Sequence, residues 1–197
     1  MADVLEWPSG LLPSTFNWYL KSNGTSFTSP FNGHTQTVRW VGSMWKATLT
    51  MSSLDELEAI AMEALLFEMD GLAGRVKLRD FGRTPSVVNG TPRVNGANQL
   101  GTTLNTDGWT PNTLVLKKGS YFTVNDELKY VLANVTSNAS GQASIKFAPQ
   151  LRVAPADNLV LEVANPYAIF RLVNDENGVE RKPAFDNDFS LEFIEAF

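Results

Sequence analysis

Few side chains of this chain could carry out chemistry. Of its 197 residues none is Cys and one, His34, is His, which excludes thiol nucleophiles, iron–sulfur clusters and zinc sites that need thiolate ligands. A Ser-His-Asp triad would need His34 as its base, but no Gly-x-Ser-x-Gly motif accompanies this residue. We therefore interpret His34 as a turn or surface residue.

Acidic residues gather between positions 55 and 70, where the sequence has six carboxylates and no basic residue. Pairs such as Glu56 with Glu63 could serve glycoside hydrolysis, but an amphipathic helix needs a polar face in any case. The acidic runs at 175–178 and 186–188 lack the alternating ligands and the closing Glu of an EF-hand. We expect no enzymatic activity, no cofactor and no bound metal.

The element that holds these carboxylates is a helix predicted over residues 53–72. Ser53 and Glu56 fit a capping box, and Asp55 favours the positive end of the helix dipole. Apolar residues then recur at helical spacing, at Leu57, Ile60, Ala61, Ala64 and Leu65. A predicted strand with three basic residues follows at once, namely Arg75, Lys77 and Arg79.

The rest of the chain predicts β-strands. Alternation of apolar and polar residues indicates half-buried antiparallel strands over 16–20, 38–40 and 45–51, with a turn at Ser22-Asn23-Gly24. A segment rich in Gly, Pro, Thr and Asn, 83–113, has few apolar repeats and is typical of a domain boundary. Short strands are predicted after it, over 113–116, 121–124, 128–135, 143–147 and 159–163. Asn177-Gly178 predicts a hairpin between strands 168–173 and 180–182, and Phe189, Leu191 and Phe193 alternate near the C-terminus.

These elements predict a mainly β fold. We expect an antiparallel β-sandwich or split barrel with one flanking helix in residues 1–87 and 165–197, and a small β-barrel inserted over 88–164. The last strand is too apolar to be left unpaired, and the first sheet is its obvious partner. The alternative is two consecutive domains, with 165–197 in the second.

Charge and hydropathy limit the partners of the chain. The net charge of −5 and a pI near 4.9 argue against binding to nucleic acid through phosphate contacts. The N-terminal residues have no basic charge, and nowhere do 18 apolar residues follow one another, so we expect neither a secretory signal nor a membrane span. Trp7 and Trp109 lie in less regular segments and are candidate exposed contact residues. A non-catalytic carbohydrate-binding or adhesin-type β module would use them.

Several segments together resemble one protein family. They are Pro13-Ser14-Thr15-Phe16-Asn17-Trp18, Ser26-Phe27-Thr28-Ser29-Pro30, Gln36-Thr37-Val38, Trp45-Lys46-Ala47-Thr48-Leu49, Gly71-Leu72-Ala73-Gly74-Arg75, the stretch from Leu116 to Phe122, that from Leu151 to Asp157, and Phe189 to Phe197. With the acidic helix, they look like the distal tail proteins of bacteriophages with long non-contractile tails.

The resemblance implies a structural role. Distal tail proteins form a hexameric ring that joins the tail tube to the baseplate hub and to tail fibre or receptor-binding proteins. The implied location is the tail tip of the virion, assembled in the host cytoplasm, with DNA passing through the ring without specific binding. Negative charge on the lumen would keep that DNA from adhering.

The charged residues supply a hypothesis for contacts between subunits. The acidic helix of one subunit, with Asp55, Glu56 and Glu63, would dock on the basic strand of its neighbour, with Arg75, Lys77 and Arg79. Such complementarity fixes register more than it adds affinity.

Overall fold

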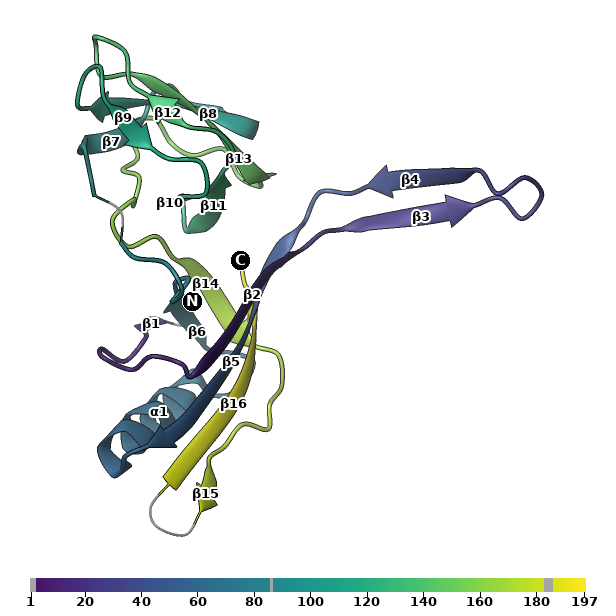
Figure 1. The fold of residues 1–197 in the computed structure, drawn as a ribbon, viewed down its shortest axis with the longest axis vertical. Helices are drawn as coiled ribbons and strands as arrows, with labels where there is room; N and C mark the ends of the chain where they lie inside the picture. Colours follow the sequence, from purple (N-terminus) through teal and green to yellow (C-terminus); the bar gives the residue numbers. More distant parts are fainter. Residues whose placement is uncertain (1–2, 86, 183–185) are drawn as a thin grey trace.

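Strands from both ends of the chain form one curled sheet, the main sheet (Figure 1). The computed structural model describes residues 3–85, 87–182 and 186–197. The strand order is β1 (Val4–Glu6), β6 (Arg75–Leu78), β14 (Ala168–Leu172), β16 (Asp186–Glu195), β5 (Met44–Leu54) and β2 (Thr15–Lys21), and β15 (Glu180–Lys182) pairs with β16. All pairs are antiparallel except β1 with β6, which is parallel. The expectation of a mainly β fold with one helix is confirmed.

The helix α1 (Glu56–Met69) packs against the main sheet through Ala59, Met62, Leu65, Leu66 and Met69. Its capping box consists of Asp55 and Glu58, so the predicted pair of Ser53 and Glu56 is wrong. The reason is that β5 continues to Leu54, which places Ser53 inside a strand. The helix ends at Met69, and its C-cap Asp70 has a left-handed φ of 49°, so it is shorter than the predicted 53–72.

The middle of the chain forms a second β unit, the insert. Its strands are β7 (Gly90–Val94), β8 (Gly101–Trp109), β9 (Leu114–Leu116), β10 (Tyr121–Val124), β11 (Glu127–Val131), β12 (Val135–Thr136) and β13 (Ala143–Leu151). Five of them form a sheet in the order β10-β11-β13-β8-β7, and β9 pairs with β12. The insert has its own core, which includes Phe122, Ile145 and Phe147.

Three details of the predicted strands differ from the structure. β7 and β8 lie in the segment interpreted as a boundary, because the buried face of β8 carries Thr106 beside Leu104 and shows no apolar alternation. The predicted strand 159–163 forms only isolated bridges. The predicted hairpin at Asn177-Gly178 is wrong, since β14 pairs with β6 and β16 while β15 pairs with β16.

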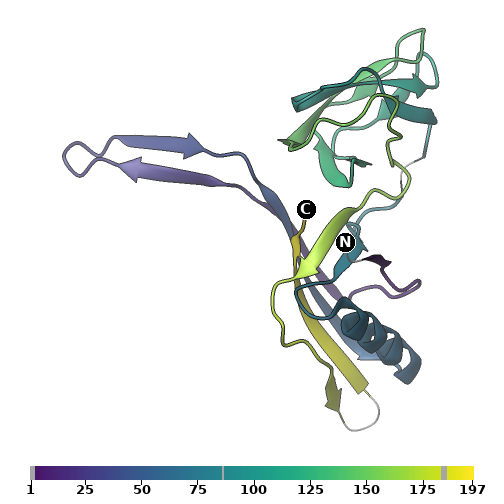
Figure 2. The same cartoon turned by 180° about the vertical axis from the view of Figure 1, so that it is seen from behind.

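A long hairpin projects from the main sheet (Figures 1 and 2). We call residues 22–42 the arm; its strands β3 (Gly24–Thr28) and β4 (Thr35–Arg39) pair only with each other. The turn predicted at Ser22-Asn23-Gly24 is wrong, because the backbone N–H of Trp40 donates to Asn23 O (2.8 Å) and the paired strands continue outward. The chain reverses at 29–34 instead, where Ser29 N–H donates to His34 O (2.9 Å) and Gly33 has a φ of 69°.

Candidate assembly surfaces

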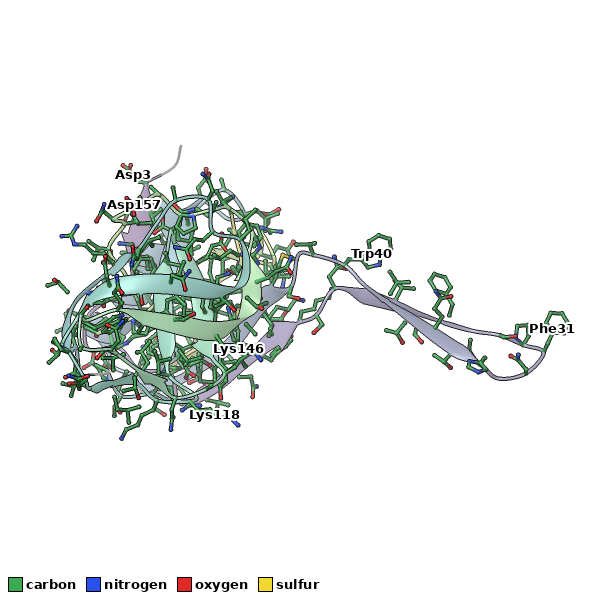
Figure 3. The ribbon with its side chains drawn as sticks, turned by 90° about the horizontal axis from the view of Figure 1, so that it is seen from above. Asp3, Phe31, Trp40, Lys118, Lys146 and Asp157 are labelled. Atoms are coloured by element: carbon green, nitrogen blue, oxygen red, sulfur yellow. The ribbon has the colours of Figure 1, made fainter. Side chains whose placement is uncertain are left out.

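The arm exposes large apolar side chains. Every residue of β3 is exposed, and the exposed fractions of the arm's large apolar side chains are 60% for Phe27, 97% for Phe31, 54% for Trp40 and 64% for Val41. Figure 3 shows Phe31 at the tip and Trp40 nearer the body, both directed away from the ribbon. The structure confirms a strand at Val38, which is partly buried, but Trp40 is 54% exposed, and no layer formed by the described residues covers this face of the arm.

Strand register gives the arm two unlike faces. Thr25 pairs with Val38 and Phe27 pairs with Gln36, and cross-strand partners in an antiparallel pair share a face. Trp40 continues the alternation of Gln36 and Val38, so Phe27, Val38 and Trp40 lie on one face together with Thr25 and Gln36. We call this face, which holds the large apolar side chains of the two strands, the apolar face. The other face holds the pairs Ser26 with Thr37 and Thr28 with Thr35. The arm is therefore amphipathic, as a strand pair is when one of its faces is to be covered.

A charged network holds the base of the arm and the insert against the main sheet. The guanidinium of Arg152 donates to the Glu195 carboxylate (2.9 and 3.2 Å) and to Ser43 O, and it lies 3.5 Å from the centre of the Phe197 ring. Glu195 is buried, and its Oε2 also accepts the backbone N–H of Trp45 (2.9 Å). Residues from the insert, β16 and the start of β5 thus meet at one side chain.

A second buried pair lies beside this network. Lys129 is completely buried, and its Nζ donates to Glu127 Oε2 (2.6 Å) and to Gln150 O (3.0 Å). Burial lowers the pKa of Lys129, and the hydrogen bond to Glu127 opposes that shift. Glu127 also accepts the backbone N–H groups of Arg152 and Val153. These charges are satisfied within the chain, so their arrangement suits a structural role rather than proton transfer.

The residues predicted to form a subunit interface have contacts inside the chain. Asp55 caps α1, and Glu63 pairs with Arg181. Lys77 Nζ pairs with Glu6 (2.6 Å), and the Arg75 guanidinium donates to the carbonyls of Leu72, Ala73 and Gly74.

The remaining two predicted interface residues are exposed. Arg79 lies over the Phe81 ring, and Glu56 is in the first turn of α1. Docking of the acidic helix on the basic strand of a neighbour stays a prediction, but Asp55, Glu63, Arg75 and Lys77 all have roles within one copy.

The two tryptophans proposed as exposed contacts are not exposed. Trp109 is 3% exposed, and its Nε1–H donates to Thr106 Oγ1 (2.8 Å) within the insert, so this prediction is wrong. Trp7 is half-buried, with its Nε1–H donating to Leu11 O (2.9 Å) and its ring 5.4 Å from that of Phe81. Both rings are used for packing, because the irregular segments around them fold back onto apolar cores.

A cleft of about 430 Å³ lies between the main sheet and the insert. Its charged lining includes Arg79, Arg83, Lys117 and Lys118, with Asp80 as the acidic residue. Burial, and then the nearby Asp80, raise the pKa of Tyr121 at this cleft, so its phenol stays protonated. The described residues contain no group of three or more His, Cys, Asp or Glu side chains that could hold a metal ion.

The sequence predicted the helix, but it did not predict that residues 22–42 project from the main sheet as a hairpin. The available signal was a stretch that combines Phe27, Phe31 and Trp40 with Ser, Thr and Gly and contains no acidic residue.

Across 3–85, 87–182 and 186–197, no helix has the length and hydropathy required to cross a bilayer. No protein-family model and no curated protein matches the chain.

Proposed function

We propose that this chain is a structural protein of a bacteriophage tail tip that assembles with copies of itself into a ring. In this function the ring, a hexamer by resemblance, joins the tail tube to the baseplate hub and to tail fibre or receptor-binding proteins, and DNA passes through it. The observation that carries self-assembly is the projecting arm.

The arm supports self-assembly because its own chain does not stabilise it. A two-stranded hairpin is at best marginally stable in water, and Phe31 makes almost no contact that removes it from solvent. Burying a Phe side chain contributes roughly 1.5–3 kcal/mol, so covering Phe27, Phe31 and Trp40 would stabilise an assembly by several such amounts. A projecting element that binds a different surface of the next copy makes a heterologous contact. Copies joined by such contacts form a closed ring when the rotation that relates each copy to the next divides a full turn evenly.

The tail-tip assignment is supported by the resemblance of segments along most of the chain. The mainly β fold with one helix agrees with the fold that the resemblance implies. The acidic composition and the absence of Cys suit a part that lets DNA pass and performs no reaction.

The alternative function, a carbohydrate-binding or adhesin-type module, depends on Trp7 and Trp109 as exposed contact residues. Trp109 is buried in the insert and cannot stack on a sugar, and Trp7 is half-buried against the core of the main sheet, where its ring contacts Phe81.

Shortening the arm tests the proposal. Residues 24–39 are replaced by Asn-Gly, a sequence suited to a tight hairpin turn between Asn23 and Trp40, which already face each other. Light scattering and native mass spectrometry should show a multimer for the full chain and a monomer for the shortened chain. The thermal unfolding of the rest should be unchanged, because the arm lies outside both cores.

Single substitutions provide the matched control. Phe31→Ser should weaken assembly, whereas Leu100→Ser, which changes a 62% exposed residue of the insert, should not. A full chain that stays monomeric at all concentrations, and above all one that binds glycans, would overturn the proposal.

A further inference from the structure

The outer side of α1 is apolar as well as its inner side. Leu57 and Phe67 are 78% and 79% exposed, Ile60 is 52% exposed, and Ala64 is exposed between them. At 3.6 residues per turn these four residues fall within about 80° of one another, on the side opposite to Met62 and Leu66. We call Leu57, Ile60, Ala64 and Phe67 the outer row. A surface helix of a monomer normally carries polar side chains here, so the outer row is a surface that lacks its cover.

Acidic residues border the outer row. By the same helical geometry Glu56 and Glu63 lie along one side of it and Glu68 along the other. No basic residue occurs between 55 and 70, but Arg181 of β15 pairs with Glu63. The negative charge beside the outer row therefore comes from Glu56 on one side and Glu68 on the other. A partner that covers it should be apolar at its centre and free of acidic groups.

The arm fits that description in composition and in length. The arm has no Asp or Glu, so the acidic border of the outer row does not repel it. On its apolar face, Phe27 lies opposite Gln36, and Trp40 is four residues further along the second strand, about 13 Å away at the rise of a β-strand. The outer row runs from Leu57 to Phe67, which is about 15 Å at the rise of a helix.

The arm cannot cover the outer row of its own chain. The arm joins the main sheet at Met44, the first residue of β5, whereas α1 follows the other end of β5, at Leu54, after the cap residue Asp55. The length of β5 separates these points by about 33 Å, and the arm extends away from the helix (Figures 1 and 2). The occupant that matches in charge, apolarity and length is therefore the arm of a second copy.

We propose that the apolar face of the arm of one copy lies along the outer row of α1 in the next copy. This inference rests on the self-assembly proposed above and names its contact. Phe27 and Trp40 cover Leu57, Ile60 and Phe67, while the acidic border selects a segment without carboxylates. Each copy gives one arm and receives one, which makes the contact heterologous.

Disulfide cross-linking between two single variants tests the contact. The chain has no Cys, so Phe27→Cys and Phe67→Cys each introduce the sole thiol of their copy. When the two full-length variants are mixed and oxidised, mass spectrometry should find the disulfide between positions 27 and 67. The matched control mixes Phe27→Cys with Leu100→Cys, at an exposed apolar residue of the insert, and should yield several-fold less cross-link.

A second measurement uses assembly itself. Phe67→Ser should weaken assembly at least about tenfold, as truncation of an aromatic hot spot does, while thermal unfolding of the monomer stays unchanged because the side chain is exposed. If Phe67→Ser assembles like the wild type, or position 67 stays equally open to maleimide in the multimer and in the arm-shortened monomer, the contact is wrong although self-assembly stands. A wild-type chain that neither assembles nor cross-links overturns both proposals.

Discussion

Arg152 shows how much of the structure one side chain can hold together. Its guanidinium reaches a carboxylate on β16, a carbonyl at the base of the arm and the ring of the C-terminal residue Phe197. The Glu195 side chain is 1% exposed. Removing the Arg152 guanidinium therefore leaves a buried carboxylate that water cannot solvate. An exposed pair such as Lys77 with Glu6 does not carry this penalty, because water solvates whichever charge remains.

We expect Arg152→Ala to lower the free energy of unfolding by about 3–5 kcal/mol, the usual loss when one partner of a buried pair is removed. Lys77→Ala, the matched control, should lower it by at most about 1 kcal/mol. Urea denaturation of both variants measures the difference. If both variants lost equally little free energy of unfolding, the Glu195 carboxylate would have to be solvated by water, and the expected penalty would be wrong.

At the scale of elements, the start of α1 shows why the sequence leaves a choice open. Both Ser53 with Glu56 and Asp55 with Glu58 have the spacing of a capping box. The side chains near the helix do not determine which pair forms the cap. The pairing with β16 does, because Asn187 pairs with Leu54 and so extends β5 past Ser53. The helix itself was predictable from its apolar spacing, whereas its first residue depends on a strand that lies far away in the sequence.

Substitution at the two candidate caps should separate them. Asp55→Ala removes the carboxylate that accepts the Glu58 N–H (2.8 Å), so we expect a loss of about 0.5–2 kcal/mol in the free energy of unfolding. Ser53→Ala should change it by no more than about 0.5 kcal/mol, as expected of an exposed side chain outside the cap. Thermal or urea unfolding followed by circular dichroism gives both values. A larger loss for Ser53→Ala would contradict the cap seen here.

The arm marks the limit of prediction from alternation. The pattern of Val38 and Trp40 resembles that of Ala47 and Leu49 in β5, which the sequence correctly indicates as half-buried. Alternating apolar and polar residues indicate a strand with one apolar face. They do not indicate whether the layer that covers this face belongs to the same chain. The same holds for Trp109: an irregular neighbourhood says little about burial when β8 has Thr and Asn on its faces.

At the scale of the whole molecule, residues of the insert complete the core of the main sheet. Tyr121 and Leu128 belong to the insert, yet they lie in the apolar cluster of the main sheet. The Trp45 Nε1–H donates to Leu128 O (3.0 Å), and the Trp45 ring lies 5.8 Å from that of Tyr121. Neither unit can separate without exposing these side chains to water.

We therefore expect the monomer, prepared with the shortened arm, to unfold in one cooperative transition. Calorimetry should give one peak, and tryptophan fluorescence and far-ultraviolet circular dichroism should have the same midpoint. In Tyr121→Ala the shared contact shrinks, and the two units should separate into two transitions. Two well-resolved transitions in the parent monomer would show that the insert is an independent body.

In the assembly proposed above, the separation of the arm from the outer row determines which species are stable. In any open chain of copies, the first and last members keep one arm and one outer row uncovered, however many copies lie between them. Only closure of the ring covers every one of them, so the final contact stabilises two ends at once. Open intermediates should be short-lived, and monomers and closed rings should dominate a mixture at equilibrium.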